Sequence, residues 1–306
     1  VDGIAGGGKN LISYLLASLP KIEHVNPYAA AEQICGMVNL KKLSLETADY
    51  LLKNNYNRMF YDTALLRNIN FRKSDKSSVL NHPRYKFIKK RLDSNDKKVF
   101  SNYKNKIITH FLTHHISNHS EPIFRSFNKK LLFIRILRSP LNISIIKNLA
   151  KWSIKWEKMD SRDSQIKVFS KKFKKNFPHF IKDKSNEYLK ANIYERAIMI
   201  LESALIEKKK FSGFEKKYGS KIITIPFENL ITKPNFYIQQ VSKFLSLKID
   251  MITVKEMRKN SVPRKFDLKK HDADGLRFIK NKVRKKYFNK AFYLNNYYHK
   301  SIINKH

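Results

Sequence analysis

The sequence predicts an α/β fold in which helices flank a mostly parallel β-sheet. Three observations support this prediction. Short apolar runs rich in β-branched residues alternate with longer segments of helical spacing, a pattern typical of chains that build parallel sheets. A glycine-rich turn joins the first apolar segment to the first helical one. The 306 residues contain no internal repeat and no biased linker, so we expect a single domain over residues 1–306.

The first part of the chain begins with one strand and continues with helices. Residues 1–4 predict the end of a buried strand that is truncated at its amino end, and residues 10–18 predict the helix after it. Apolar residues recur at helical spacing over residues 28–60, with polar breaks near residues 39–44. Residues 61–97 hold few sustained apolar runs and predict a long loop with short helices.

The rest of the chain contains the clearest strands. Residues 107–112 and 130–136 are compact, apolar and β-branched, which predicts two buried parallel strands, and residues 221–227 predict a third. The stretch 160–186 is basic and aromatic and predicts no definite element. Amphipathic helices are expected at residues 141–158, 187–207 and 234–245.

The glycine-rich turn is the most informative motif. Residues 3–10 read GIAGGGKN, which has the form G-x4-G-K-N. Glycines allow successive backbone N–H groups to face one concavity, Lys9 adds a positive charge, and the following helix offers its N-terminus to an anion. The pattern differs from the Walker A motif at Asn10, where a Ser or Thr hydroxyl would hold Mg²⁺. The turn therefore predicts a phosphate site and argues against metal-dependent phosphoryl transfer, with a ligand-free helix cap as the alternative.

The composition limits the classes of partner. The chain carries 63 Lys and Arg against 25 Asp and Glu, a formal net charge of +38 that would attract nucleic acid, anionic membranes or polyanionic substrates. The lysines are spread along the whole chain, so we expect no specific nucleic-acid site. The single cysteine, Cys35, excludes an intramolecular disulfide and fits a reducing compartment. The sequence contains no apolar run of about 18 residues, so it predicts no transmembrane segment. We expect a cytoplasmic location, and an upstream signal or anchor stays open.

Three polar features follow the predicted strands at their carboxyl ends, where open α/β sheets bind ligands. They are the glycine turn, the sequence Thr113-His114-His115 and the turn Arg138-Ser139-Pro140. A neutral His accepts a proton from an attacking hydroxyl, and a guanidinium binds phosphate with two hydrogen bonds. The sequence thus predicts one anion site with a proton acceptor beside it, and a purely structural His is the alternative.

In this order, the motifs resemble those of the sulfotransferases that use 3′-phosphoadenosine 5′-phosphosulfate (PAPS), over most of the chain. The glycine turn occupies the position of the family's [KR]-S-G-T-T loop, and residues 133–140, FIRILRSP, look like its strand ending in R-[DN]-P. The most specific match is IPFENLITKP at residues 225–234, which with FLSL at 244–247 is similar to Y-E-D-L-x-x-D-P and F-L-G-L. Residues 257–260, MRKN, resemble the late R-K-G element, and residues 112–114, LTH, resemble K-T-H.

The resemblance implies a P-loop-like sulfotransferase architecture and transfer of a sulfuryl group from PAPS to a hydroxyl acceptor, without a metal. It implies that His114 is the general base, that Arg138 grips the 3′-phosphate and that Lys9 assists the leaving group. Phe227 would pack on the adenine or in the core. Second candidates for the base follow the first helix, and they are Glu23, His24 and Glu32. The expected donor-binding residues are Gly6, Gly7, Gly8, Lys9, Asn10, Leu11, Arg138, Ser144, Lys147, Phe227, Arg258 and Lys259.

Several positions depart from the family pattern. The basic residue that opens the family's loop is Gly6 here, and the positive charge lies three places later, at Lys9. Ile146 stands where the family has a Ser for the 3′-phosphate, with Ser144 and Lys147 as neighbours that would compensate. In the late element, Asn replaces Gly. An inactive member of the fold is therefore one alternative.

The acceptor and two rival functions stay open. We expect residues 61–97 and 160–186 to form the acceptor side, because variable loops build such pockets. The sequences of these two stretches do not show which class of acceptor is used, and a carbohydrate, a lipid headgroup, a small alcohol and a peptide tyrosine all stay open. A P-loop kinase or NTPase would need a Mg²⁺-holding Asp after a buried strand, where this chain has Arg138. The non-enzymatic alternative is a basic protein that binds polyanions.

Overall fold

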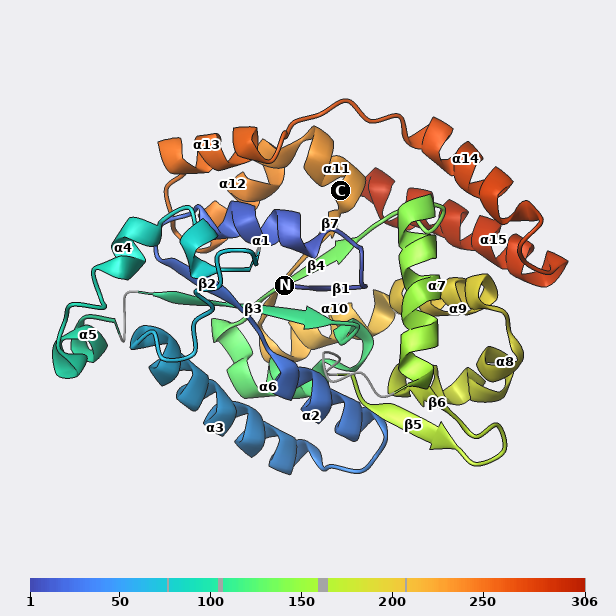
Figure 1. Cartoon of the computed structure of the whole chain (residues 1–306), viewed down its shortest axis with the longest axis horizontal. Coiled ribbons are helices and arrows are strands. Elements are labelled where there is room, and N and C mark those ends of the chain that lie inside the picture. Colours follow the sequence, from blue (N-terminus) through green and yellow to red (C-terminus); the bar gives the residue numbers. More distant parts are fainter. Residues whose placement is uncertain (76, 104–106, 159–164, 207, 306) are drawn as a thin grey trace.

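The fold is organised around a parallel five-stranded sheet, as the sequence predicts (Figure 1). The computed structural model describes residues 1–75, 77–103, 107–158, 165–206 and 208–305. The strand order is β2-β3-β1-β4-β7, and each pair of neighbours is parallel. The bounds are β1 (Asp2–Gly3), β2 (Ile22–Pro27), β3 (Ile108–His114), β4 (Leu132–Leu137) and β7 (Lys221–Pro226).

Strand β4 lies between β1 and β7 and is buried over all but its first residue. Its sequence LFIRIL suits this place, because β-branched side chains pack well on a sheet that is covered on both faces. Its one charged residue, Arg135, is buried and donates a hydrogen bond to the backbone carbonyl of Ala204. The turn that carries Arg138 thus follows a strand that is held on both sides.

Helices cover both faces of the sheet. One apolar cluster joins a face of β4 and β7 to helices α1, α11, α12 and α13, and a second joins β4 to α2, α3 and α6. A third cluster includes Leu137 at the end of β4 and joins helices α7, α9 and α15. The bounds of these helices are α1 (Lys9–Ala17), α2 (Ala29–Asn39), α3 (Leu45–Ala64), α6 (Glu121–Phe127), α7 (Ile143–Glu157), α9 (Ile193–Leu205), α11 (Phe227–Thr232), α12 (Pro234–Phe244), α13 (Met251–Lys259) and α15 (Lys285–Ser301).

Most of the predicted helices are confirmed by these bounds. The polar break near residues 39–44 separates α2 from α3, and the helix predicted at 141–158 is α7. Residues 61–97 contain the end of α3 and short helices, as expected. The remaining helices are α4 (Tyr85–Lys89), α5 (Asp96–Tyr103), α8 (Ser185–Lys190), α10 (Lys208–Tyr218) and α14 (Leu268–Lys280), with short 3₁₀ turns at Val79–Asn81, Ser117–His119, Asn128–Lys130, His179–Lys184 and Ile303–Lys305.

The structure corrects the sequence analysis at three places. Residues 22–27 form the edge strand β2, where we predicted no strand. The helix expected at 187–207 is divided into α8 and α9, because Asn192 starts α9 with a capping box. The stretch 160–186 contains a hairpin of β5 (Lys167–Ser170) and β6 (Lys175–Pro178), while its residues 160–164 lie outside the described residues.

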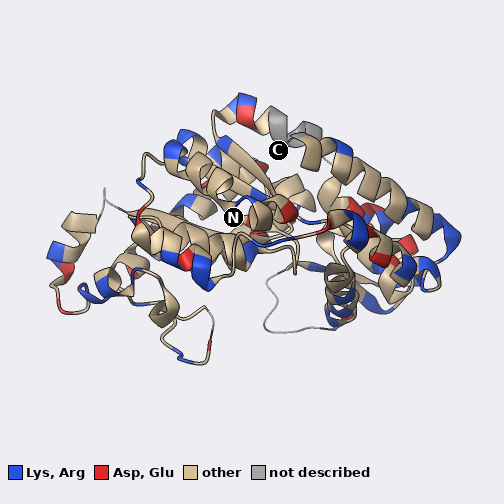
Figure 2. Cartoon of the chain, turned by 90° about the horizontal axis from the view of Figure 1, so that it is seen from above, with Lys and Arg blue, Asp and Glu red and all other residues tan. Residues whose placement is uncertain are grey.

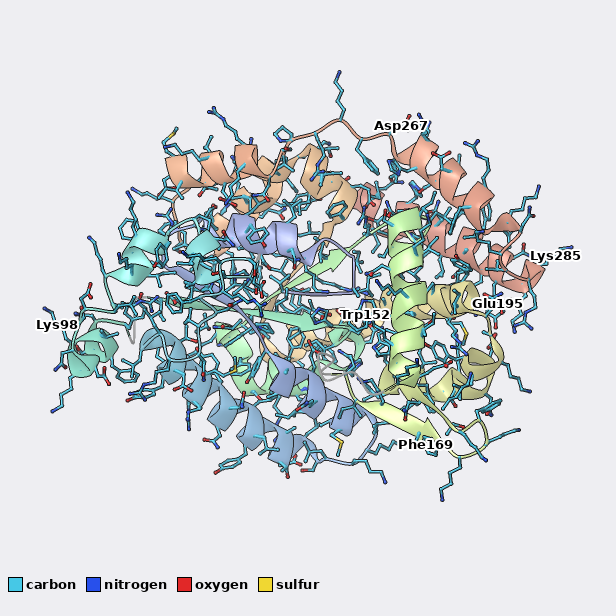
Figure 3. The ribbon with its side chains drawn as sticks, in the orientation of Figure 1. Lys98, Trp152, Phe169, Glu195, Asp267 and Lys285 are labelled. Carbon is cyan, nitrogen blue, oxygen red and sulfur yellow. The ribbon has the colours of Figure 1, made fainter. Side chains whose placement is uncertain are left out.

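Positive charge is distributed over the molecule. Figure 2 shows Lys and Arg on elements at both ends of the fold, and in Figure 3 Lys98 and Lys285 project from opposite ends. Such a distribution raises the affinity for any polyanion without forming a specific site. Within the part of the chain that the structure describes, none of the helices combines the length and apolar character needed to cross a bilayer.

Candidate functional site

The glycine turn lies between β1 and α1, at the carboxyl end of the sheet. Gly6 and Gly8 have φ values of 81° and 103°, which favour glycine because a side chain there is strained. A Cβ atom at Gly6 would lie 2.8 Å from Asn148 Nδ2, and one at Gly8 would lie 2.1 Å from Cδ2 of Phe227. The turn is therefore closely packed from two sides and requires glycine at both positions.

Helix α1 begins directly after the turn, with Gly8 as its N-cap. No side chain caps the helix, and its first turn holds no acidic residue. The N–H groups of the first helical turn and the positive end of the helix dipole can therefore face an anion. Asn10 is exposed and Leu11 is half-buried in this first turn. Both belong to the predicted donor site.

Lys9 lies under the turn. Its Nζ donates hydrogen bonds to the carbonyl oxygens of Gly3, at 2.7 Å, and Ile4, at 2.9 Å, and the residue is only 5 % exposed. Burial lowers the pKa of Lys9 to about 8, while Asp2 and Glu32 oppose this shift. In this arrangement the ammonium group holds the turn to β1. To contact a leaving group, as the sequence analysis predicts, it would have to exchange these two carbonyl contacts.

Arg138 joins the same site from the end of β4. Its Nη1 donates a hydrogen bond of 3.0 Å to the carbonyl oxygen of Gly6. Its guanidinium carbon lies 4.4 Å from the centroid of the Phe227 ring, close enough for a cation–π interaction. The same ring packs against Gly8. The predicted donor-site residues Gly6, Gly8, Arg138 and Phe227 are thus in contact, although they are far apart in the sequence.

A second arginine near Arg138 was missed. Arg264 lies close enough to Arg138 to interact with it electrostatically, and its backbone N–H donates to the Ile231 carbonyl at 2.8 Å. Its side chain is exposed. Arg264 and Lys265 form a basic pair six residues after the predicted pair at 258–259, so the sequence did contain a signal for this position.

Buried polar groups support the turn that carries Arg138. The N–H of Ser139 donates to Glu228 Oε1 at 3.1 Å, and its hydroxyl donates to Asp272 Oδ1 at 2.8 Å. The hydroxyl of Tyr298 donates to the second oxygen of Glu228. Helix α14 approaches so closely that a Cβ atom at Gly275 would lie 1.9 Å from the Leu141 carbonyl oxygen. These contacts support the turn that carries Arg138, and three of the residues involved, Asp272, Gly275 and Tyr298, were not identified by the sequence analysis.

His114 ends β3 and is paired in register with Gly3, the last residue of β1 and the first of the GIAGGGKN motif. Its ring Nδ1 lies 2.9 Å from Oε1 of Glu32, which also accepts the backbone N–H of His114 at 2.8 Å. Glu32 is 2 % exposed, whereas 38 % of the His114 side chain is accessible. We assign the Nδ1 proton to this hydrogen bond, which leaves Nε2 with a lone pair that can accept a proton.

A glutamine fixes this pair from the opposite side. Nε2 of Gln165 donates to Glu32 Oε2 at 2.9 Å and to the backbone carbonyl of His114 at 2.8 Å. Glu32, a second candidate for the base, is thus placed as the partner that orients His114. Gln165 lies in the stretch 160–186 and carried no recognisable signal in the sequence.

The other two candidate bases lie elsewhere. Glu23 and His24 belong to the first half of β2, whereas the site lies at the carboxyl ends of the strands. Both oxygens of Glu23 accept hydrogen bonds from Arg91 Nη2, at 3.1 and 2.9 Å, and His24 packs edge-on against His82. Both residues are buried in this strand.

The remaining donor-site candidates do not share these contacts. Ser144 and Lys147 are exposed on α7, and the Lys147 ammonium lies 5.3 Å from the Phe278 ring centroid. Ile146 is buried in the core, as its apolar side chain requires. At the end of α13, Arg258 is exposed and Lys259 lies 3.7 Å from Glu256. Their contribution to a 3′-phosphate site stays a prediction.

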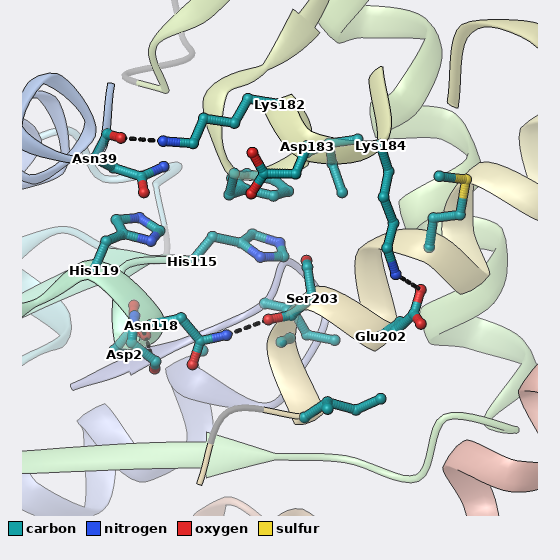
Figure 4. Close-up of a pocket in the computed structure, with 18 of the residues that line it drawn as sticks. Asp2, Asn39, His115, Asn118, His119, Lys182, Asp183, Lys184, Glu202 and Ser203 are labelled. Atoms are coloured by element: carbon teal, nitrogen blue, oxygen red, sulfur yellow. Dashed lines mark hydrogen bonds and ion pairs between the residues drawn. The ribbon is translucent and has the colours of Figure 1, made fainter. Parts of the chain in front are cut away.

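A cavity of about 240 Å³, whose lining includes many polar side chains, adjoins the site (Figure 4). Gly3 and Ile4 line it from β1 and the start of the turn, and His115 lines it from the residue after His114. Residues 180–184 of the predicted acceptor stretch form part of its wall. In Figure 4, dashed lines join Lys182 to Asn39, Lys184 to Glu202 and Asn118 to Ser203. The cavity can therefore offer both donors and acceptors to a small polar molecule.

The site combines a glycine turn before an uncapped helix N-terminus, a cation and an oriented histidine. Among the described residues, no group of three or more His, Cys, Asp or Glu side chains is arranged to hold a metal ion. Such a site is suited to bind a phosphorylated ligand and to accept a proton beside it. Comparisons with protein-family models, with curated proteins and with solved structures found no match to this chain.

Proposed function

We propose that the protein is a sulfotransferase that transfers a sulfuryl group from PAPS to a hydroxyl acceptor. The observation that carries this proposal is the contact between Arg138 and the glycine turn, since Nη1 lies 3.0 Å from the Gly6 carbonyl oxygen. A guanidinium beside an amide-lined turn suits a nucleotide with two separate phosphate groups. His114, on the strand next to β1, supplies the proton acceptor.

The residues of the turn fit the donor. The side chains of Asn148 and Phe227 occupy the space beside Gly6 and Gly8, so a phosphosulfate would approach the turn from its backbone N–H side. The uncapped N-terminus of α1 adds partial positive charge at the same place. When bound, PAPS would supply a sulfuryl group attached to a phosphate that leaves readily. Phe227, with Gly8 on one side and Arg138 close to its ring, would form a wall of this site.

The residues of the chain would perform three tasks in the transfer. Nε2 of His114 takes the proton of the acceptor hydroxyl, so that the acceptor oxygen bonds to sulfur while the bond from sulfur to the phosphate oxygen breaks. The turn and the α1 N-terminus stabilise the negative charge that develops on that phosphate oxygen. Glu32 stabilises the imidazolium that forms. The cavity beside Gly3 is our candidate for the acceptor pocket.

A ligand screen tests the proposal against its rivals. We expect 3′,5′-bisphosphoadenosine, the product of the transfer, to raise the melting temperature by mass action. A rise with ATP and Mg²⁺ alone, together with ATP hydrolysis, would instead favour a P-loop NTPase. Binding of heparin that falls steeply with salt and ignores the nucleotide would favour a polyanion-binding protein. Either of these outcomes without a response to 3′,5′-bisphosphoadenosine would refute the sulfotransferase proposal.

The Arg138→Ala variant tests the 3′-phosphate assignment. We expect its affinity for 3′,5′-bisphosphoadenosine to fall by about 10- to 100-fold, because a hydrogen bond to a charged group contributes about 1.5–3 kcal/mol. The affinity for 5′-AMP, which lacks the 3′-phosphate, should change much less. Isothermal titration calorimetry measures both, and Arg67→Ala, an exposed arginine paired with Asp96, is the matched control. Equal losses for the two nucleotides would place the 3′-phosphate elsewhere.

A further inference from the structure

The cavity beside the glycine turn has a balanced lining, although the chain as a whole carries a net charge of +38. With histidines neutral, the formal charges of the lining cancel, because it holds three acidic and three basic side chains, which are Asp2, Asp183, Glu202, Arg135, Lys182 and Lys184. Such a lining gives an anion no local electrostatic advantage over an uncharged molecule. The cavity therefore differs in charge from the outer surface of the protein.

The basic side chains of the lining already have partners. Nζ of Lys184 lies 2.8 Å from Glu202 Oε2, and Lys182 donates a hydrogen bond to the carbonyl oxygen of Asn39 (Figure 4). Arg135 is buried and donates to a backbone carbonyl. An anionic ligand would have to displace these contacts before a cation could bind it, whereas an uncharged ligand leaves them intact.

Asp183 brings a carboxylate to the cavity without an ion pair. In the view of Figure 4 this carboxylate lies between the side chains of Lys182 and His115. Within the described ranges of the chain, it makes neither an ion pair nor a hydrogen bond. Carboxylate oxygens accept hydrogen bonds from neighbouring hydroxyl groups and repel an anion. Asp183 thus favours an uncharged, hydroxylated ligand over an anionic one.

His115 forms another part of the cavity wall, and its backbone is held in an unusual conformation. Its φ of 55° lies in the left-handed region, which is uncommon for residues other than glycine. The next two backbone N–H groups, of Ile116 and Ser117, donate to the Asp2 carboxylate at 3.3 and 2.9 Å. The imidazole stacks on the Phe180 ring, with 4.5 Å between centroids and 9° between planes. Because backbone strain is concentrated at functional sites, this enforced ring position indicates a role in binding.

Two polar atoms of the cavity lining are enclosed without a hydrogen-bond partner among the residues that the structure describes. They are Nε2 of His115, a residue that is 7 % exposed, and Oδ1 of Asn118, whose amide nitrogen donates to Ser203. Burial, and to a smaller extent Lys9, lower the pKa of His115 to about 3 against an opposing effect of Asp2, so the ring is neutral at physiological pH. Unpartnered buried polar groups are unfavourable, and a ligand hydroxyl can donate to them or accept from them.

We propose that this cavity selects an uncharged polyhydroxyl acceptor, with the size of a single sugar or cyclic polyol ring, and rejects anionic acceptors. Its volume of about 240 Å³ lies below the roughly 300–1,000 Å³ of pockets for drug-sized ligands, which suits one ring better than a segment of a polymer. Asp183, His115 and Asn118 form hydrogen bonds with the hydroxyl groups of this ring. Because it takes the cavity as the acceptor pocket, this assignment rests on the proposed function.

Matched sugars test the charge preference. Methyl β-glucoside and methyl β-glucuronide share one ring and differ in a CH₂OH group against a carboxylate, and ligand-detected NMR measures their binding to the full chain without PAPS. We expect the glucoside to bind at least about tenfold more tightly. Methyl β-galactoside and methyl β-galacturonide repeat the comparison with a second ring, and a preference for the uncharged sugar in either pair supports the proposal. Equal or tighter binding of the anionic sugar in both pairs, or no binding of either uncharged sugar, would overturn it.

An Asp183→Lys variant tests the origin of this preference. Reversal of the charge should reduce the ratio of the two affinities at least about tenfold, whereas Asp183→Asn, which keeps a hydrogen-bond acceptor, should reduce it less. Asp93→Asn is the control, because Asp93 is exposed and precedes α5 at the other end of the fold (Figure 1). An unchanged ratio in Asp183→Lys would overturn the charge selection that we assign to this residue.

A His115→Phe variant tests the adjoining wall. The phenyl ring can keep the stacking on Phe180 but offers no nitrogen, so we expect methyl β-glucoside to bind about threefold to tenfold more weakly. The rise in melting temperature with 3′,5′-bisphosphoadenosine should be unchanged. Equal affinities of the parent and the variant for the glucoside would contradict a contact between His115 and the ligand.

Transfer assays distinguish a failure of this assignment from a failure of the proposed function. Sulfuryl transfer from PAPS that favours methyl β-glucuronide would overturn the selection of uncharged acceptors and support the sulfotransferase. Tighter binding of methyl β-glucoside without transfer to any of the sugars, together with no response to 3′,5′-bisphosphoadenosine, would support the selection of uncharged ligands and refute the sulfotransferase.

Discussion

The His114→Ala variant is expected to lose sulfuryl transfer by a factor of about 10²–10⁴, the usual contribution of a positioned general base. The affinity for 3′,5′-bisphosphoadenosine should stay within about twofold, because His114 lies on β3 while the nucleotide contacts are assigned to the turn and Arg138. Single-turnover kinetics with PAPS and a simple alcohol measure the first quantity, and calorimetry measures the second. An unchanged rate would remove His114 from the mechanism.

A Glu32→Gln variant separates orientation from charge. The glutamine oxygen can still accept the Nδ1 proton of His114, but it cannot stabilise the imidazolium with a negative charge. We therefore expect a rate between those of the parent and His114→Ala. A Glu23→Gln variant is the comparison, since Glu23 is also buried but pairs with Arg91. A rate loss that is equal for the two glutamate variants would indicate general destabilisation.

Replacing Gly8 with alanine should have the largest effect on stability. The new Cβ atom would lie 2.1 Å from the Phe227 ring, in a backbone conformation with a φ of 103° that alanine rarely adopts. We expect the free energy of unfolding to fall by roughly 2–4 kcal/mol, from backbone strain of about 1–3 kcal/mol and a forced shift of the ring. Urea denaturation measures this loss, and nucleotide binding should be lost with it.

Two further variants identify the cause of that loss. Gly213→Ala is the control, because a Cβ atom there meets nothing within 4 Å and the residue lies within α10, where alanine is the better helix former. Its stability should be equal or higher. The double variant Gly8→Ala with Phe227→Ala removes the steric conflict and keeps the backbone strain. If the double variant is no more stable than the sum of the single changes predicts, the contact with Phe227 is not the cause.

The elements that the sequence predicted best are those with a strong local pattern. The run LLFIRIL and the glycine turn identified β4 and the start of α1, because apolar periodicity and glycine both act locally. Strand β2 was missed because its sequence, IEHVNP, places Glu23 and His24 among apolar residues. These polar side chains are compensated by Arg91 and His82 from residues much later in the chain. No local pattern could predict such partners.

The residues of the candidate site also fall into two groups, those with a local signal in the sequence and those placed by tertiary contacts. His114, Arg138 and the glycines were identified because each lies at or just after the carboxyl end of a strand, and parallel strands bring these ends to one edge of the sheet. The orientation of Lys9 could not be predicted, because the choice between a ligand and two backbone carbonyls depends on three-dimensional packing. The roles of Glu32 and Gln165 depend on the contact of α2 and the 160–186 stretch with the end of β3. Such tertiary contacts produce no recognisable pattern of residue spacing in the sequence.

The absence of a side chain at Gly275 allows the C-terminal part of the chain to pack against the turn that carries Arg138. Because α14 lies directly on the Leu141 backbone, a side chain at position 275 would collide with a carbonyl oxygen that no substitution at position 141 can remove. Removal of the last two long helices would take away Asp272 and Tyr298 together, leaving Ser139 and Glu228 without those partners. The C-terminal helices therefore support the turn that carries Arg138, and under the proposed function a shortened form of the protein should lose nucleotide binding even though its glycine turn is intact.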